Sequence, residues 1–342
     1  MNVFRWDRAQ RDVIRGGIAW NWRFAGFGAA MGLVAVVMVF AGEVLTGTYL
    51  LIGSVPAAVV GLAPQRDARR PVLIVGVLFG VSILLGSILA VWVPLAVVGM
   101  FVVGYLAAQV AAWKPAGVVA LSVILPLTAI GLTYQGIADS AKVAGLMILG
   151  AIGSYIWALV LPEYEGDVPQ QPQMTPAEAK RYGLVLGVAG AVSTLVAFAL
   201  DVDFVGWLVG STLLVIRPTW DLLSARGIGR VISVIVGGVA AALLLLADLP
   251  TPAIAIVLWL VLVTMAATSA SRWYVTPAFT SFLILWALLY GQAERNGVKV
   301  KLDERVVDTV IGVAVAYLVS GAFLLLGRVA ANRPHDEARV AS

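Results

Sequence analysis

Three arginines in this sequence each precede a glycine by seven positions at the start of an apolar run: Arg69 and Gly76, Arg230 and Gly237, Arg305 and Gly312. Seven residues are two turns of an α-helix, so each arginine shares a helix face with its glycine. A glycine lets a neighbouring helix approach closely, and an arginine beside that contact can bind an anion or reach the membrane interface. Each pair is therefore a candidate anion-binding element.

The third pair lies in the charged stretch DERVVDTVIGVAVAY, which spans residues 303–317. Arg305 and Asp308 are three residues apart, close enough to pair on a helix. One interpretation is an outer gate, in which Arg305 attracts a carboxylate, Asp308 competes for the arginine and Thr309 offers a hydroxyl. The alternative is an interfacial cap, since the helix dipole favours acidic side chains near a helix N-terminus.

Other residues are candidates for binding or energy coupling. Lys114 and Arg272 are expected near the inner mouth, each beside a tryptophan, Trp113 or Trp273, where charge and a stacking surface suit an aromatic carboxylate. The alternative is anchoring, because such residues are enriched at any membrane interface. For proton coupling, the candidate carboxylates are Glu43 and Asp308.

Three aromatic residues are predicted near the outer ends of equivalent helices: Tyr134, Trp286 and Tyr290. They are expected either to line an exit or to anchor the protein in the aromatic belt of the membrane.

The composition is that of an integral membrane protein. Of its 342 residues 61% are hydrophobic and 12% charged, and the mean hydropathy is +0.96. A helical span needs about 20 mostly apolar residues, whereas barrel strands alternate strictly over about 10, which this sequence does not do. We predict an all-α integral membrane fold of about 12 transmembrane helices, at residues 24–42, 46–63, 71–92, 95–112, 116–134, 141–161, 182–200, 204–217, 229–247, 251–270, 274–291 and 305–327.

The distribution of Lys and Arg orients these helices, because short cytoplasmic loops retain positive charge. With the N-terminus inside, 18 of the 23 Lys and Arg residues fall on the cytoplasmic side and five on the outer side. Both termini are therefore predicted to be cytoplasmic. Residues 3–22 combine arginines with large apolar side chains and are expected to form an interfacial amphipathic helix.

A polar linker divides the predicted helices into two groups of six. Its end reads as a helix start, with Thr175 as N-cap, Pro176 next and Glu178 three residues after the cap. Short stretches match between the halves, such as LLIGS at Leu50 and WLVGS at Trp207. We predict two parallel six-helix repeats around a shared pathway. The segments are an interfacial N-terminal segment (1–23), the first repeat (24–161), the linker (162–181), the second repeat (182–327) and a cytoplasmic tail (328–342).

The second half resembles the fusaric acid resistance (FUSC) family of aromatic acid exporters, whose membrane domains carry a helix that opens Arg-x-x-x-Thr-x-x-Gly. Arg305, Thr309 and Gly312 match this pattern in full, and Arg230 and Gly237 match it without the threonine. The sequence looks like a compact form of the family without its large soluble domain.

The stretch of residues 217–238 is similar to the family's polar loop and motif helix. The resemblance implies export of aromatic or other organic carboxylates across the bacterial inner membrane. Plant malate-type anion channels are similar to the same membrane unit, so an organic-anion channel is an alternative.

Several other functions are poorly supported by the sequence. There is no cysteine, and the single histidine, His335, lies in the polar tail, so thiolate chemistry, Cys-based metal sites and an imidazole proton relay within the membrane are not expected. No acid, base or metal cluster suggests an enzyme or a cofactor. The net charge of +4 reflects the basic inner face, not a nucleic-acid surface. The expected partners are a small organic anion and the lipid bilayer; a homo-oligomer and a non-transporting scaffold are left open.

Overall fold

The computed structural model describes residues 17–113, 117–134, 136–166, 174–217, 220–271, 275–292 and 298–340. Within these ranges the secondary structure is helical and contains no strand, as the composition predicts. A short 3-10 helix, η1 (Asp67–Arg69), precedes α4. The α-helices are α2 (Trp22–Phe40), α3 (Val44–Val60), α4 (Arg70–Leu89), α5 (Val93–Trp113), α6 (Gly117–Gly131), α7 (Ile137–Val160), α8 (Pro176–Ala199), α9 (Val205–Val215), α10 (Trp220–Leu246), α11 (Thr251–Ala267), α12 (Val275–Gln292) and α13 (Val298–Val340).

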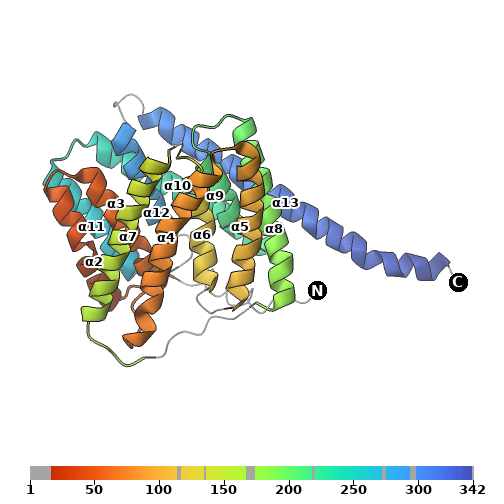
Figure 1. The fold of residues 1–342 in the computed structure, drawn as a ribbon, viewed down its shortest axis with the longest axis horizontal. Helices are drawn as coiled ribbons and strands as arrows, with labels where there is room; N and C mark the ends of the chain where they lie inside the picture. Colours follow the sequence, from red (N-terminus) through yellow and green to blue (C-terminus); the bar gives the residue numbers. More distant parts are fainter. Residues whose placement is uncertain are drawn as a thin grey trace.

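Each apolar run of the sequence coincides with one of these helices. Among the described residues, seven helices are long and apolar enough to cross a membrane, and α3, α9, α11 and α12 are shorter apolar helices. We call the end of the bundle with residues 200–204 the outer end, following the predicted topology, and the end with residues 162–166 the inner end. The outer end is at the top in Figure 1.

The N-terminal and linker predictions have different outcomes. Residues 17–21 are not helical, contrary to the predicted amphipathic helix, and the rest of that segment lies outside the described residues. The non-helical segment is held by the end of α11, since Asn21 N donates to the Ala267 carbonyl over 2.9 Å. At the linker, the predicted capping box of Thr175 and Glu178 is confirmed.

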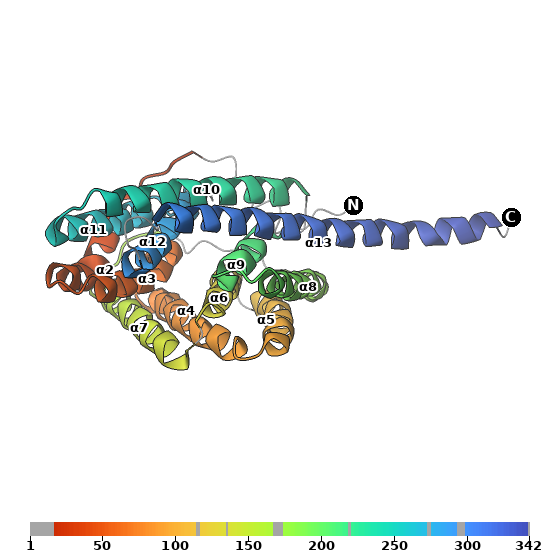
Figure 2. The same ribbon diagram turned by 90° about the horizontal axis from the view of Figure 1, so that it is seen from above.

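The short helix α9 lies inside the protein. Ten of its 11 residues are buried, so it is surrounded by other helices and need not span the lipid itself. By contrast, α10 and α13 run side by side across one face of the bundle, and α13 continues well beyond it (Figure 2). The weakest apolar run of the sequence is therefore a central element.

Several helix–helix contacts occur twice in the bundle. If each helix of one contact is replaced by the helix six places away along the chain, another observed contact results. The pairs are α2–α11 with α8–α5, α4–α6 with α10–α12, α3–α7 with α9–α13, and α3–α12 with α9–α6. The contacts α3–α12 and α9–α6 join the two halves of the chain at the centre of the bundle. Helices α3, α6, α9 and α12 thus meet where a pathway between two halves would run.

Candidate functional site

The three glycines of the Arg–Gly pairs lie where two helices approach closely. Gly76 packs on α7, Gly237 on α12 and Gly312 on α9, and a Cβ at any of the three would clash with atoms of that neighbour. The arginine of each pair contacts the same helix or its end. The predicted shared face is confirmed for all three pairs.

Arg69 is occupied by structural contacts. Its side chain is fully buried, and its guanidinium donates to five backbone carbonyls at the ends of α3 and α7: Ala63, Pro64, Ala158, Leu161 and Pro162. These bonds tie the start of α4 to two helix ends whose carbonyls lack helical partners. The first pair is therefore a clamp within the fold and not an anion site.

Arg230 has a different environment. It lies in the middle of α10 and is only 7% exposed. Its Nη1 donates to the Ser281 hydroxyl over 3.2 Å, and its guanidinium carbon lies 5.3 Å from the centroid of the Trp207 ring. No carboxylate within the described part of the chain forms an ion pair with it. Arg230 is therefore a buried cation that no anion of the described ranges balances.

Arg230 forms part of the wall of a cavity, which we call the inner cavity. It has a volume of about 250 Å³ and lies among α3, α4, α6, α9, α10 and α12. Its charged and hydroxyl-bearing lining residues are Arg226, Arg230, Thr276 and Thr280, and the rest of its lining is almost entirely apolar. Such a cavity combines positive charge and hydrogen-bond donors with an apolar surface, as a binding site for an organic anion requires.

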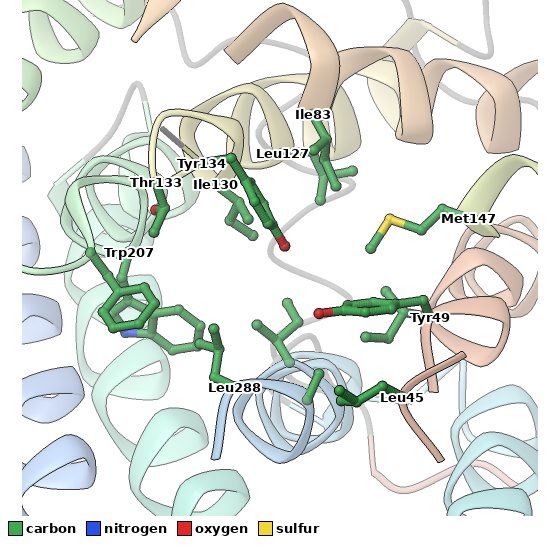
Figure 3. A pocket seen from close by; sticks show the side chains of 14 residues that line it. Leu45, Tyr49, Ile83, Leu127, Ile130, Thr133, Tyr134, Met147, Trp207 and Leu288 are labelled. Atoms are coloured by element: carbon green, nitrogen blue, oxygen red, sulfur yellow. The ribbon is translucent and has the colours of Figure 1, made fainter. Parts of the chain in front are cut away.

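A second cavity, the outer cavity, continues from the first toward the outer end. It has a volume of about 290 Å³ and is lined by residues of α3, α4, α6, α7, α9 and α12 and of the turns beside them. Its polar lining groups come from Tyr49, Thr133, Tyr134 and Trp207 (Figure 3). Both cavities share the lining residues Ile52, Leu127, Ile130, Trp207 and Ile284, so they meet in one layer of side chains.

Trp207, a member of that layer, is held by the motif helix α13. Its indole Nε1 donates to the Thr309 hydroxyl over 2.9 Å, and that hydroxyl donates to the Arg305 carbonyl over 2.7 Å. Thr309 thus positions Trp207 and is fully buried, instead of offering a free hydroxyl beside Arg305. The sequence did not lead us to predict Trp207 as a site residue. The feature that could have indicated it is the difference between the matched stretches of the two halves, where Trp207 stands at the position of Leu50.

The predicted pair of Arg305 and Asp308 is confirmed as an ion pair. The distance from Nη1 to Oδ2 is 2.9 Å, and the side chains are 2% and 7% exposed. Arg305 Nη2 lies 3.3 Å from Glu304 Oε2, and its guanidinium carbon lies 4.0 Å from the centroid of the Phe204 ring. Phe204 also lines the outer cavity, so the buried charge pair contacts a residue of that cavity's wall.

The pair also lines an open hollow at the outer end. The hollow has a volume of about 440 Å³ and contains five carboxylates, those of Asp201, Asp203, Asp303, Glu304 and Asp308. At its rim Lys301 Nζ donates to Asp203 Oδ2 over 2.9 Å, and this bond holds the pKa of Asp203 below its ordinary value. The hollow is therefore predominantly negative.

The other predicted site residues lie apart from the cavities or outside the described residues. Glu43 is the exposed N-cap of α3 and accepts a 3.3 Å hydrogen bond from Thr46. Three other predicted residues, Lys114, Arg272 and Trp273, lie outside the described residues. The same is true of the side chain of Trp113, the last residue of α5.

Of the three outer aromatic residues, only Tyr134 is a lining residue of the outer cavity. Trp286 and Tyr290 stack on each other, with ring centroids 5.1 Å apart. Among the described residues, no group of three or more His, Asp or Glu side chains could hold a metal ion.

The fold and these cavities define an all-helical, multi-pass membrane protein with a buried cationic cavity. Residues 191–319 match the family model described as fusaric acid resistance protein-like, which confirms the resemblance seen in the sequence and points to a role in membrane transport or resistance. The matched segment contains both motif helices, with Arg230 and Arg305. Neither the curated proteins nor the solved structures include a match to this chain.

Proposed function

We propose that this protein is a bacterial inner-membrane transporter that exports small organic anions, in particular aromatic carboxylates, through a pathway between two six-helix repeats. The observation that carries the proposal is the inner cavity with Arg230. A buried cation is costly unless it is paired, so a bound anion would supply the partner that the described chain does not. A guanidinium binds a carboxylate through two parallel hydrogen bonds, and the nearby Trp207 indole offers an aromatic ring a surface.

The paired helix contacts support a pathway between two repeats. The two cavities are lined chiefly by α3 and α6 from the first half and α9, α10 and α12 from the second. A shift of six helices relates α3 to α9 and α6 to α12, and the contacts that join these helices across the halves are related in the same way. A pathway at such an interface can alternate between inner and outer openings by movement of one half against the other.

We further propose that Phe204, Arg305 and Asp308 form the outer gate. The observations that support this are that Phe204 lines the outer cavity and that the Arg305 guanidinium lies 4.0 Å from the centroid of its ring. When the Phe204 ring swings away, Arg305 can leave Asp308 and meet the carboxylate of the substrate. Protonation of Asp308 would favour this exchange, which makes Asp308 the coupling carboxylate that fits the proposal. The acidic hollow then repels the released anion and disfavours its return.

Transport into inverted membrane vesicles tests the function. Vesicles that contain the protein are expected to accumulate labelled 4-hydroxybenzoate when a pH gradient is applied, and control vesicles without the protein are not. Anion currents that need no gradient would instead support an organic-anion channel, which the continuous stack of two cavities would also allow. If neither flux nor current appears, the transport proposal is wrong and a scaffold role is favoured.

Topology is tested by cysteine labelling, which is simple here because the chain has no cysteine. Gln170→Cys and Asn332→Cys are expected to be protected from an impermeant thiol reagent in intact cells, and Asn296→Cys is expected to react. All three should react after the cells are lysed, which controls for local burial. Reaction at position 170 in intact cells would contradict the predicted orientation.

A further inference from the structure

The inner and outer cavities are stacked along the helix axes. On α12, the inner cavity begins at Thr276 and the outer cavity extends to Leu288. At 1.5 Å per residue this separation corresponds to about 18 Å. On α3 the lining residues also change from Tyr49 in the outer cavity to Val59 in the inner cavity. The two cavities therefore adjoin in one elongated space, and Trp207 is among the five residues that line both.

The two ends of this space differ in polarity. The inner end has the guanidinium groups of Arg226 and Arg230 in its wall. No cation lines the outer cavity, whose walls are made by described residues that are mainly aliphatic or aromatic. Its most prominent polar groups are the hydroxyls of Tyr49 and Tyr134, which extend into it and point toward one another (Figure 3).

The hydroxyls of these two tyrosines face a cavity, unlike those of two other tyrosines of the fold. Tyr182 donates its hydroxyl hydrogen to the Ile216 carbonyl, and Tyr164 donates to the Leu62 carbonyl. Those hydroxyls are used to join chain segments. The Tyr49 and Tyr134 hydroxyls instead hydrogen-bond to each other across the outer cavity. Because each hydroxyl has one donor and two acceptor positions, the pair keeps one donor and several acceptor positions with which to bind a ligand.

The separation of the two polar groups can be estimated along α12. Arg230 contacts Ser281, and Leu288 is the last residue of α12 that lines the outer cavity, the cavity that also contains the two tyrosines. Seven residues of helix correspond to about 10 Å. A one-ring acid with a short side chain and a polar group at its far end has a matching length.

We propose that the outer cavity is a second binding subsite, in which Tyr49 and Tyr134 bind a neutral hydrogen-bonding group at the end of the substrate opposite its carboxylate. This inference rests on the proposed function and narrows the substrate class to elongated, amphipathic monoanions. The carboxylate lies at Arg230, the apolar body passes Trp207, and a hydroxyl or carbonyl reaches the tyrosines. A second carboxylate would enter an apolar cavity whose described lining residues provide no cation, which is unfavourable.

Binding measurements on the purified full-length protein test the subsite. Isothermal titration calorimetry would compare 3-(4-hydroxyphenyl)propanoate with 3-phenylpropanoate, which lacks only the hydroxyl. Tyr49→Phe and Tyr134→Phe are each expected to weaken binding of the hydroxylated acid about two- to tenfold, as loss of one hydrogen bond implies, and to leave binding of the other acid unchanged. Tyr290→Phe, which removes a hydroxyl from a tyrosine stacked on Trp286 outside the cavity lining, is the matched control and should change neither.

Two results would overturn the subsite. Equal loss for both acids would mean that the tyrosines only maintain the fold, and no loss for either would mean that the hydroxyls do not contact the ligand. Arg230→Gln distinguishes the subsite from the proposed function, because it should weaken both acids together. If neither acid binds the unaltered protein, the anion-transport proposal fails and the subsite fails with it.

Discussion

Replacement of Arg230 by methionine is expected to abolish transport and to make the protein more stable. The guanidinium is buried without a carboxylate partner among the described residues and has one hydrogen bond, to Ser281. An apolar side chain of similar length removes the cost of burying that charge, and comparable replacements of buried ionic groups are neutral or stabilising by about 1–4 kcal/mol. Because the same charge is proposed to hold the substrate carboxylate, transport in vesicles should fall to background.

The matched control is Arg181→Met, at an exposed position near the start of α8. It should leave both transport and the thermal unfolding temperature close to those of the unaltered protein. A stable Arg230→Met variant that still transports would remove Arg230 from the site. A strongly destabilised variant would show that the arginine belongs to the framework, as Arg69 does.

The helices of this protein could be predicted from the sequence because each is an apolar run between charged, Pro or Gly positions. Even the short run at residues 204–217 became a helix, α9. Its shortness was a sign of its location, since a helix enclosed by other helices is not required to match the thickness of the bilayer. The start of α8 was predictable too, because a capping box depends only on local residues.

The roles of the three motif arginines could not be predicted in the same way. Two-turn spacing places an arginine and a glycine on one face, but it does not say what that face contacts. Arg69 meets carbonyls about 90 residues away, from Ala158 onward, whereas Arg230 meets Ser281 and a cavity. Since those neighbours are distant in sequence, the same motif gives a clamp in one place and a candidate anion site in another.

Trp207 and Tyr49 show a second limit of sequence reasoning. In an apolar sequence, an isolated tryptophan or tyrosine is usually explained by packing or by the aromatic belt, so neither drew a functional prediction. Their importance comes from the cavities, which form only where α3, α6, α9 and α12 meet. Tyr134 was expected either to line an exit or to anchor the protein in the aromatic belt, and in the structure it lines the outer cavity.

Arg305 and Asp308 should behave as a unit in folding, and their joint removal should separate stability from gating. Arg305→Gln leaves the Asp308 carboxylate buried without its 2.9 Å partner, so we expect a loss of about 3–5 kcal/mol in the free energy of unfolding. The double variant Arg305→Met with Asp308→Leu removes both charges of this pair and should recover most of that loss. A double-mutant cycle by thermal or denaturant unfolding measures this coupling.

The exposed pair of Lys301 and Asp203 provides the control for that cycle. Its side chains are 34% and 58% exposed, so its removal by Lys301→Gln and Asp203→Asn should cost less than about 1 kcal/mol. If Arg305 and Asp308 form the outer gate, the stable double variant should still bind an aromatic acid at Arg230. It should transport that acid at less than about a tenth of the rate of the unaltered protein, because no cation next to Phe204 receives the carboxylate. Full transport by a stable double variant would show that the pair is only an anchor for α9 and α13, and the exit would then have to lie elsewhere along the outer cavity.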